Sequence, residues 1–165
     1  MERVWIGIGS NLLNPKNQVN YAIWSLSQLP ESKLVNRSKY YCSRPLGCLI
    51  QPDFLNAVVV LDTYLCPEKL LYFLNQIELH QGRIRNNGYF LNYWEPRTLD
   101  LDILLFGKHI ISNSILTVPH YDMLNREFVI YPLIELDCNF IFPNGLLIKN
   151  IINTVPKNGL SLWPD

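Results

Sequence analysis

Residues 43–61 read SRPLGCLIQPDFLNAVVVL, an irregular segment that runs directly into a strongly strand-like one. Two prolines and a glycine prevent Ser43–Asp53 from forming one regular element, whereas Phe54–Leu61 is apolar and rich in valine. The strand expected before it, Lys33–Cys42, is separated from it by too few residues for a helical crossover. These two strands are therefore expected to pair antiparallel.

A strand–helix–strand pattern lies on each side of this junction. Upstream, an apolar strand at Val4–Gly9 precedes a helix at Asn17–Leu29, whose apolar residues recur every three or four positions. Downstream, a helix at Pro67–His80 precedes a strand at Thr98–Phe106. Two such halves predict an α+β fold, a ferredoxin-like βαββαβ sandwich with a mainly antiparallel sheet and helices packed on one face.

Two weaker apolar segments follow. Asn125–Leu136 has a helical pattern despite Pro132, and Leu146–Ile152 is a shorter apolar element. Since the sequence shows no internal repeat, low-complexity tract or linker, residues 1–165 are expected to form a single domain.

Composition argues against several classes of protein. The chain has 14 Lys and Arg against 14 Asp and Glu, and this balance disfavours a sequence-independent nucleic-acid binder. Hydrophobic residues make up 48%, which is not typical of a disordered chain. No apolar run reaches the roughly 20 residues that span a bilayer, and the first residues do not resemble a secretory signal. We expect a cytoplasmic protein that binds neither nucleic acid nor membrane, and we expect it to be monomeric.

The four cysteines are Cys42, Cys48, Cys66 and Cys138. None forms a Cys-x-x-Cys pair, and the histidines are not spaced from them as zinc ligands are. We expect reduced, mostly buried thiols that pack as small hydrophobic groups.

The strongest sign of chemistry is the alternation in TLDLDI, residues 98–103. In a strand the two leucines and the isoleucine share one face, and Asp100 and Asp102 share the other. Two carboxylates side by side suit hard cations such as Mg²⁺. The alternative is an edge strand whose acidic face is simply wetted by solvent.

Three of the seven arginines, Arg83, Arg85 and Arg97, lie shortly before this strand. Guanidinium groups bind phosphate oxygens, so arginines beside paired acids provide what phosphoryl transfer requires. Alternatively, Arg83 and Arg85 offset the dipole of the preceding helix, and Arg97 pairs with one of the aspartates.

The long loop Gly82–Pro96 has four aromatic residues among asparagines and glycines. We interpret it as a lid that closes over a planar ligand and excludes water. The alternative is that these aromatic side chains pack on the flank of the domain.

Phe54 and Asn56 share a strand face and offer a stacking plane beside an amide that donates and accepts hydrogen bonds. Arg126 and Phe128 are grouped with them as a candidate ligand site, although a core aromatic and a satisfied asparagine are the simpler reading. The turn GIGSN, residues 7–11, lacks the third glycine of a dinucleotide-binding turn, and we reject that interpretation.

Six segments, taken in order, resemble one enzyme family. They are IGSNL (8–12), RPLG (44–47), QPDFLNAV (51–58), IELHQGRIR (77–85), PRTLDLDILLFG (96–107) and LTVPHYDMLNREFVIYPLIE (116–135). Along nearly its whole length the sequence is similar to the 6-hydroxymethyl-7,8-dihydropterin pyrophosphokinases of folate biosynthesis. The resemblance implies transfer of a pyrophosphoryl group from ATP, as co-substrate, to the hydroxymethyl group of the dihydropterin, with release of AMP.

The resemblance also implies the site. The catalytic residues would be Arg83, Arg97, Asp100 and Asp102, and the two aspartates would hold two Mg²⁺ ions that bridge the phosphates of ATP. The ATP site would be formed by Leu71, Asn75, Glu78, Arg83, Arg85, Trp94, Arg97, Ile103, Thr117, His120 and Tyr121. The pterin site would be formed by Ser43, Leu46, Phe54, Asn56, Trp94, Arg126 and Phe128, with the two phenylalanines on either side of the ring.

The chain departs from the family pattern in a few places. The loop between Arg85 and Trp94 is longer than in typical members, and Tyr93 stands where an arginine is frequent. Arg44 replaces a common proline and adds a cation beside the pterin pocket, and Ile115 replaces an arginine of some relatives. These changes leave the aspartate pair intact, so activity is expected.

Two other functions remain to be weighed against this one. A two-metal phosphoesterase would use the same aspartates to activate water, and it differs in its products. A non-catalytic RNA-binding module is disfavoured, because the chain has no net charge and its strands lack an aromatic and basic pattern.

Overall fold

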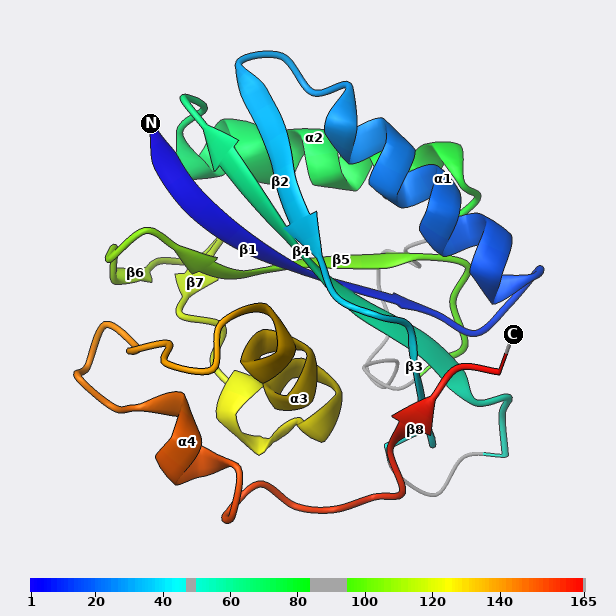
Figure 1. The fold of residues 1–165 in the computed structure, drawn as a ribbon. Coiled ribbons are helices and arrows are strands. Elements are labelled where there is room, and N and C mark those ends of the chain that lie inside the picture. Colours follow the sequence, from blue (N-terminus) through cyan, green and yellow to red (C-terminus); the bar gives the residue numbers. More distant parts are fainter. Residues whose placement is uncertain (47–49, 84–94, 165) are drawn as a thin grey trace.

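The computed structural model describes residues 1–46, 50–83 and 95–164. Figure 1 shows a twisted sheet between helices. The strands of this sheet are β1 (Glu2–Ser10), β2 (Ser32–Arg37), β3 (Tyr41–Ser43), β4 (Phe54–Thr63), β5 (Asp100–Phe106) and β8 (Ser161–Leu162). Their order is β5-β1-β4-β3-β8, β2 also pairs with β4, and every pairing is antiparallel. The predicted α+β architecture with an antiparallel sheet is confirmed.

Helices α1 (Pro15–Ser27) and α2 (Pro67–His80) cover one face of the sheet (Figure 1). Each has a proline in its first turn, and the side chain of Asn14 caps α1 by accepting a hydrogen bond from Asn17 N at 3.2 Å. Their apolar stripes meet the inner side chains of β1, β4 and β5 in one core. The limits predicted for α2 agree with the structure, whereas α1 begins and ends two residues earlier than expected.

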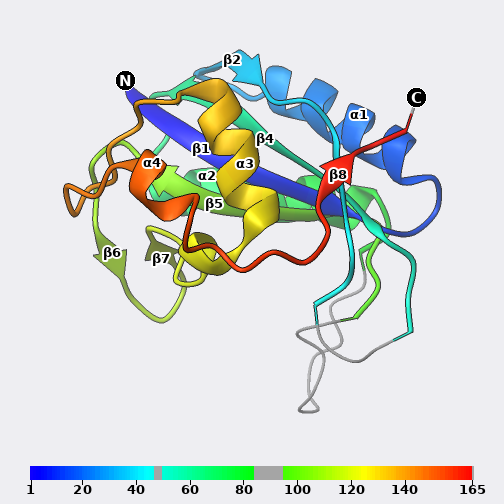
Figure 2. The same ribbon diagram turned by 60° about the horizontal axis from the view of Figure 1, so that its bottom comes forward.

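Helices α3 (Glu127–Leu136) and α4 (Ile148–Ile151) lie on the opposite face, as the turned view in Figure 2 shows for α3. They form a second core with Val58, Leu104 and Leu105 of the sheet. The expectation that helices occupy only one face is therefore wrong. The physical reason is that β4 is apolar on both faces, so both need cover from water.

The predicted strand Lys33–Cys42 is divided into β2 and β3, which both pair with β4. Between them, Ser38 N donates to Val58 O at 2.9 Å, and Ser38 Oγ accepts a hydrogen bond from Val58 N at 3.0 Å. A side-chain hydroxyl thus takes the place of a backbone carbonyl in the ladder. The buried N–H group of Val58 therefore keeps a hydrogen-bond partner at the point where the regular pairing with β4 is interrupted.

The other differences lie at element ends. Strand β5 begins two residues later than predicted, and α3 begins at Glu127 after a short 3-10 turn, η1 (Met123–Asn125). The last predicted element contains a helix only at Ile148–Ile151. A small hairpin of β6 (Ile111–Ser112) and β7 (Thr117–Val118) was not predicted. Among the described residues no helix is both long and apolar enough to cross a bilayer.

The prediction of mostly buried cysteines is wrong. Cys66 and Cys138 are exposed and Cys42 is half-buried, while Cys48 lies outside the described residues. Cys66 directly precedes α2 and Cys138 follows the end of α3, so both lie in surface connections rather than in packed elements. The described thiols are free, as expected.

Ser38→Ala tests the hydrogen bond that bridges β2 and β3. Ser38 is 1% exposed, so its loss leaves Val58 N–H buried without a partner and is expected to lower the free energy of unfolding by about 1–3 kcal/mol. Urea denaturation measures this change. Ser27→Ala is the control, since its hydroxyl donates to Trp24 O near solvent and its removal is expected to cost less than about 0.5 kcal/mol. Equal losses in the two variants would contradict the assignment.

Candidate active site

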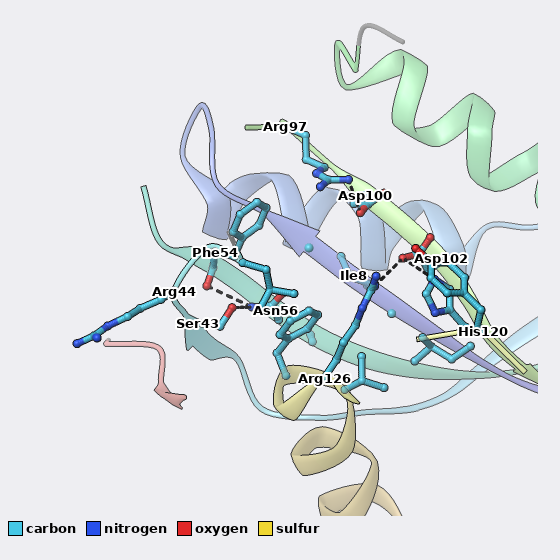
Figure 3. A pocket seen from close by; sticks show the side chains of 18 of the residues that line it. Ile8, Ser43, Arg44, Phe54, Asn56, Arg97, Asp100, Asp102, His120 and Arg126 are labelled. Atoms are coloured by element: carbon cyan, nitrogen blue, oxygen red, sulfur yellow. Dashed lines mark hydrogen bonds and ion pairs between the residues drawn. The ribbon is translucent and has the colours of Figure 1, made fainter. Parts of the chain in front are cut away.

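A cavity of about 670 Å³ lies on the α3 side of the sheet, over β1, β4 and β5 (Figure 3). Its floor includes Gly7 and Gly9 of β1, which have no side chains to fill it. A Cβ built on Gly9 would lie 3.5 Å from Asn56 Oδ1 and 3.9 Å from Asp100 Cβ. Gly9 therefore lies between a polar group of β4 and the acidic pair of β5.

The aspartate pair faces this cavity. Leu99, Leu101 and Ile103 are at most 3% exposed and pack under α1 and α2. The alternation of a strand then directs Asp100 and Asp102 to the other face, where both line the cavity (Figure 3). Strand β5 is indeed at the edge of the sheet, but its acids are directed into a concave site rather than to open solvent.

Asp100 is held between two arginines. Arg97 Nη1 donates to Asp100 Oδ2 at 2.8 Å, and Arg83 Nη1 donates to Asp100 Oδ1 and to Glu78. Glu78 is 1% exposed and also accepts a hydrogen bond from Leu101 N at 2.7 Å, which ties α2 to β5. Burial lowers the pKa of Arg83, but the negative charges of Asp100 and Glu78 outweigh it and raise that pKa above its usual value.

Asp102 has more distant basic partners than Asp100. Its side chain is 37% exposed, and the nearest basic side chains in the described part of the chain are His120, with Nε2 at 3.7 Å, and Arg126, with Nη1 at 3.8 Å from Oδ2. Burial, followed by the charge of Asp100, raises the pKa of Asp102 well above its usual range. The positive charges of Arg126 and Arg83 act in the opposite direction but do not outweigh burial and Asp100.

These carboxylates fit a hard divalent cation. Their oxygens are the ligand type that Mg²⁺ prefers, and they project from one strand face into the cavity. Within the described residues no group of three or more His, Cys, Asp or Glu side chains could hold a metal. Mg²⁺ is typically bound by one or two carboxylates together with substrate phosphates and water, which matches this donor set.

His120 faces Asp102 in its neutral form (Figure 3). Burial, and then the charge of Arg126, lower the pKa of His120 to about 4. Asp122 N donates to His120 Nδ1 at 3.3 Å, so the ring proton is on Nε2, the nitrogen nearer Asp102. Tyr121 stacks on the imidazole with ring centroids 4.7 Å apart. At neutral pH His120 is therefore an uncharged hydrogen-bond donor in the cavity.

The other end of the cavity has two half-buried aromatic rings and an amide. Phe54 and Asn56 come from β4, and Phe128 comes from the first turn of α3. Asn56 Nδ2 donates to Ser43 Oγ at 2.9 Å, a contact drawn in Figure 3. Arg126 lies over the Phe128 ring with 5.8 Å between Cζ and the ring centroid. This end offers aromatic faces beside polar groups.

Most of the predicted site residues are brought together by this one cavity. Those in its lining are Ser43, Leu46, Phe54, Asn56, Arg83, Arg97, Asp100, Asp102, His120, Tyr121, Arg126 and Phe128, together with Arg44. Glu78 and Ile103 are buried behind it, and Leu71, Asn75 and Thr117 are not part of its lining. Arg85, Trp94, Tyr93 and most of the predicted lid lie outside the described residues. Ile115 is exposed and is not in the lining.

Asn11, which is not in the lining, was missed as a residue that supports the site. It is 3% exposed, its Nδ2 donates to Gln51 Oε1 and Pro52 O at 3.1 Å each, and its Oδ1 accepts from Arg97 N at 2.8 Å. It therefore joins the loop before β4 to the residue that holds Asp100. The sequence contained a signal, an asparagine directly after a buried strand, but its partners lie far along the chain.

Comparison with known proteins gives a consistent result. Residues 5–138 match the family described as 7,8-dihydro-6-hydroxymethylpterin-pyrophosphokinase. The chain is 48% identical over 152 residues to the 2-amino-4-hydroxy-6-hydroxymethyldihydropteridine pyrophosphokinase of Haemophilus influenzae, and the match covers 92% of each protein. It is 43% identical over 164 residues to the pyrophosphokinase of the same name from Pseudomonas aeruginosa, with 99% of this chain and 98% of that protein covered.

The fold is similar to that of a solved HPPK-DHPS structure from Plasmodium falciparum, with a TM-score of 0.70 at 14% sequence identity. That match covers 93% of this chain and 42% of the longer protein, and at this identity it supports the fold alone. The family match and the two bacterial relatives carry more weight, since they extend over the segments that build the cavity. On these grounds the chain belongs to the 7,8-dihydro-6-hydroxymethylpterin-pyrophosphokinase family of folate biosynthesis.

Proposed function

We propose that this pyrophosphokinase carries out its reaction in the 670 Å³ cavity, moving the pyrophosphoryl group of ATP to the hydroxymethyl group of 6-hydroxymethyl-7,8-dihydropterin. One observation carries the proposal: a single cavity combines a carboxylate pair and arginines with two aromatic rings beside an amide. The charged end suits a triphosphate with Mg²⁺, and the aromatic end suits a flat heterocycle with hydrogen-bonding edges. The products are AMP and the pterin diphosphate.

At the pterin end, Phe54 and Phe128 supply stacking faces from two different elements. Asn56 Nδ2 is engaged by Ser43, which leaves Asn56 Oδ1 to accept a hydrogen bond from an N–H group on the pterin edge. In this proposal, backbone groups near Ser43 and Leu46 form hydrogen bonds with the other polar groups on that edge of the pterin. Arg126 lies at the boundary with the charged end, 3.8 Å from Asp102.

At the ATP end, Arg83 and Arg97 bind phosphate oxygens and keep Asp100 in place. Two Mg²⁺ ions, when bound to Asp100 and Asp102, would neutralise phosphate charge and lower the pKa of the pterin hydroxyl, so we assign no side chain as general base. His120 donates from Nε2 to a phosphate oxygen, with Tyr121 beside it.

The other ATP contacts in the proposal rest on the family resemblance. They are Leu71, Asn75, Glu78, Arg85, Trp94, Ile103 and Thr117, and Trp94 also closes the pterin site. The lid formed by residues 82–96 stays a prediction from the aromatic and asparagine-rich composition of that loop. We further propose a monomer that works in the cytoplasm on two small molecules, as expected from the sequence.

Product analysis tests this function. Incubation with Mg²⁺, ATP and 6-hydroxymethyl-7,8-dihydropterin is expected to give AMP and the pterin diphosphate in equal amounts, as separated by ion-exchange chromatography. The matched control is the dihydropterin without its hydroxymethyl group, which has no acceptor oxygen and should give no AMP. ATP breakdown that is independent of the pterin would contradict the proposal and would favour a phosphoesterase.

Asp102→Asn separates a metal-binding role from a packing role. Turnover is expected to fall by about 10²–10³-fold, because the variant loses a charge that acts on the transferring group. In the metal-free wild type the pKa of Asp102 is raised, so its ionisation costs folding free energy as the pH rises above the unfolded pKa of about 3.9. The variant should therefore be at least as stable as wild type near pH 8, with a difference that shrinks toward pH 4.

Asp62→Asn is the matched control for both measurements. Asp62 pairs with Arg3 on the sheet, and this hydrogen bond lowers its pKa, so its contribution to stability is present at neutral pH and is lost in acid. The control should keep full turnover and lose a little stability near pH 8. A large loss of stability in Asp102→Asn, or turnover equal to that of Asp62→Asn, would rule out the assigned role.

A further inference from the structure

Glu127 is a buried carboxylate that the proposed reaction does not use. It is 5% exposed and lies between Arg126 and Phe128, as the first residue of α3. Its Oε1 accepts hydrogen bonds from Asn158 N at 2.8 Å and from Leu160 N at 3.1 Å. A buried carboxylate that receives two backbone N–H groups is a specific contact, because leaving its charge without them would be costly.

The turn that supplies these donors is shaped for an anion. Gly159 has φ +84°, a conformation that favours glycine, and it lies between the two donating residues. Backbone N–H groups that converge in this way form a small anion-binding concavity. Here the bound anion is a side chain of the same protein.

This turn continues directly into β8, whose partner strand β3 reaches the pterin end of the cavity at Ser43. Strand β8 pairs with β3, as Figure 1 shows, and Trp163 N donates to Tyr40 O at 2.8 Å just beyond it. Strand β3 ends in Ser43, the residue that orients Asn56. Glu127 therefore connects the first turn of α3, through the turn and β8, to the opposite wall of the cavity.

A second carboxylate anchors the far end of α3 to the same region. Glu135 accepts a hydrogen bond from Tyr41 Oη at 2.8 Å and from Lys39 N at 3.1 Å. Helix α3 is thus attached to the β3 side at both ends, but only Glu127 is adjacent to the residues that line the cavity. Both carboxylates receive two donors, but Glu135 is exposed, one of its donors is a tyrosine hydroxyl, and it lies far from Phe128 along the helix.

We propose that Glu127 is a positioning residue for the pterin: its bond to the Asn158–Leu160 turn fixes Phe128 and Arg126 opposite Phe54 and Asn56. The inference rests on the proposed function and deepens its pterin half. The arginines of the ATP end do not depend on this link, since Arg83 and Arg97 are held by Asp100. Of the acidic pair, only Asp102 has a neighbour, Arg126, that the link positions. Loss of Glu127 should therefore affect the pterin and spare ATP.

Steady-state kinetics of Glu127→Ala test the proposal. The KM for the pterin should rise by about tenfold to a hundredfold, because a small displacement of the stacking ring is enough to weaken a planar ligand. The KM for ATP and kcat should stay within about twofold of wild type. Glu127→Gln should restore the pterin KM, since both N–H groups donate to one oxygen and an amide oxygen can replace it.

Glu135→Ala is the matched control, because it removes a carboxylate of the same helix that also receives two donors. It should leave the pterin KM unchanged. A purely stabilising role of Glu127 would lower the amount of active enzyme and change neither KM. A pterin KM in Glu127→Ala equal to that of wild type or of Glu135→Ala would overturn the proposal.

Amide hydrogen exchange measured by NMR gives a readout that does not need turnover. In Glu127→Ala the amides of Asn158 and Leu160 should lose protection. Gly159→Ala should do the same, because alanine disfavours the positive φ of that turn. Unchanged protection in both variants would show that the link does not hold the turn. Wild-type enzyme that forms no AMP from the pterin would instead contradict the proposed function, and the exchange result would still decide the link.

Discussion

In the first half of β5, Leu101 and Ile103 are buried in the core under α1 and α2, and this constraint determines where the acidic residues between them point. With Leu101 and Ile103 in the core, Asp100 and Asp102 have to face the α3 side, where the cavity lies. The two aspartates have different electrostatic surroundings. Asp100 is neutralised by two arginines, whereas Asp102 has only more distant positive charge and a raised pKa. This imbalance supports the proposal that a divalent cation binds beside Asp102.

The two ends of the cavity are built from separate supports. The charged end depends on α2, through the contacts of Glu78 with Arg83 and with the backbone of β5. The aromatic end depends on the position of α3 relative to β3 and β4, to which Glu127 and the strand β8 contribute. Because each end has its own anchors, the proposed function has one cavity orient two chemically different substrates toward each other at Arg126 and Asp102.

Local patterns predicted much of this structure and long-range contacts account for the rest. The periodicity and first-turn proline of residues 67–80 were enough for α2, and the alternation in β5 was enough for the direction of the aspartates. The break at Ser38 depends on a bond to Val58, and the role of Glu127 depends on a turn some thirty residues away. The apolar run of β4 is compatible with cover on one face or on both. Such features arise from partners that sequence spacing does not reveal.

The central claim is that the aspartate pair holds the metal ions that bind ATP. A crystal structure with Mn²⁺ and a non-hydrolysable ATP analogue tests it directly, because manganese is located by its anomalous scattering. We expect two anomalous peaks in contact with carboxylate oxygens of Asp100 and Asp102, each also bound to phosphate oxygens of the nucleotide. Manganese bound elsewhere, with both aspartates engaged only by protein groups or water, would contradict the account.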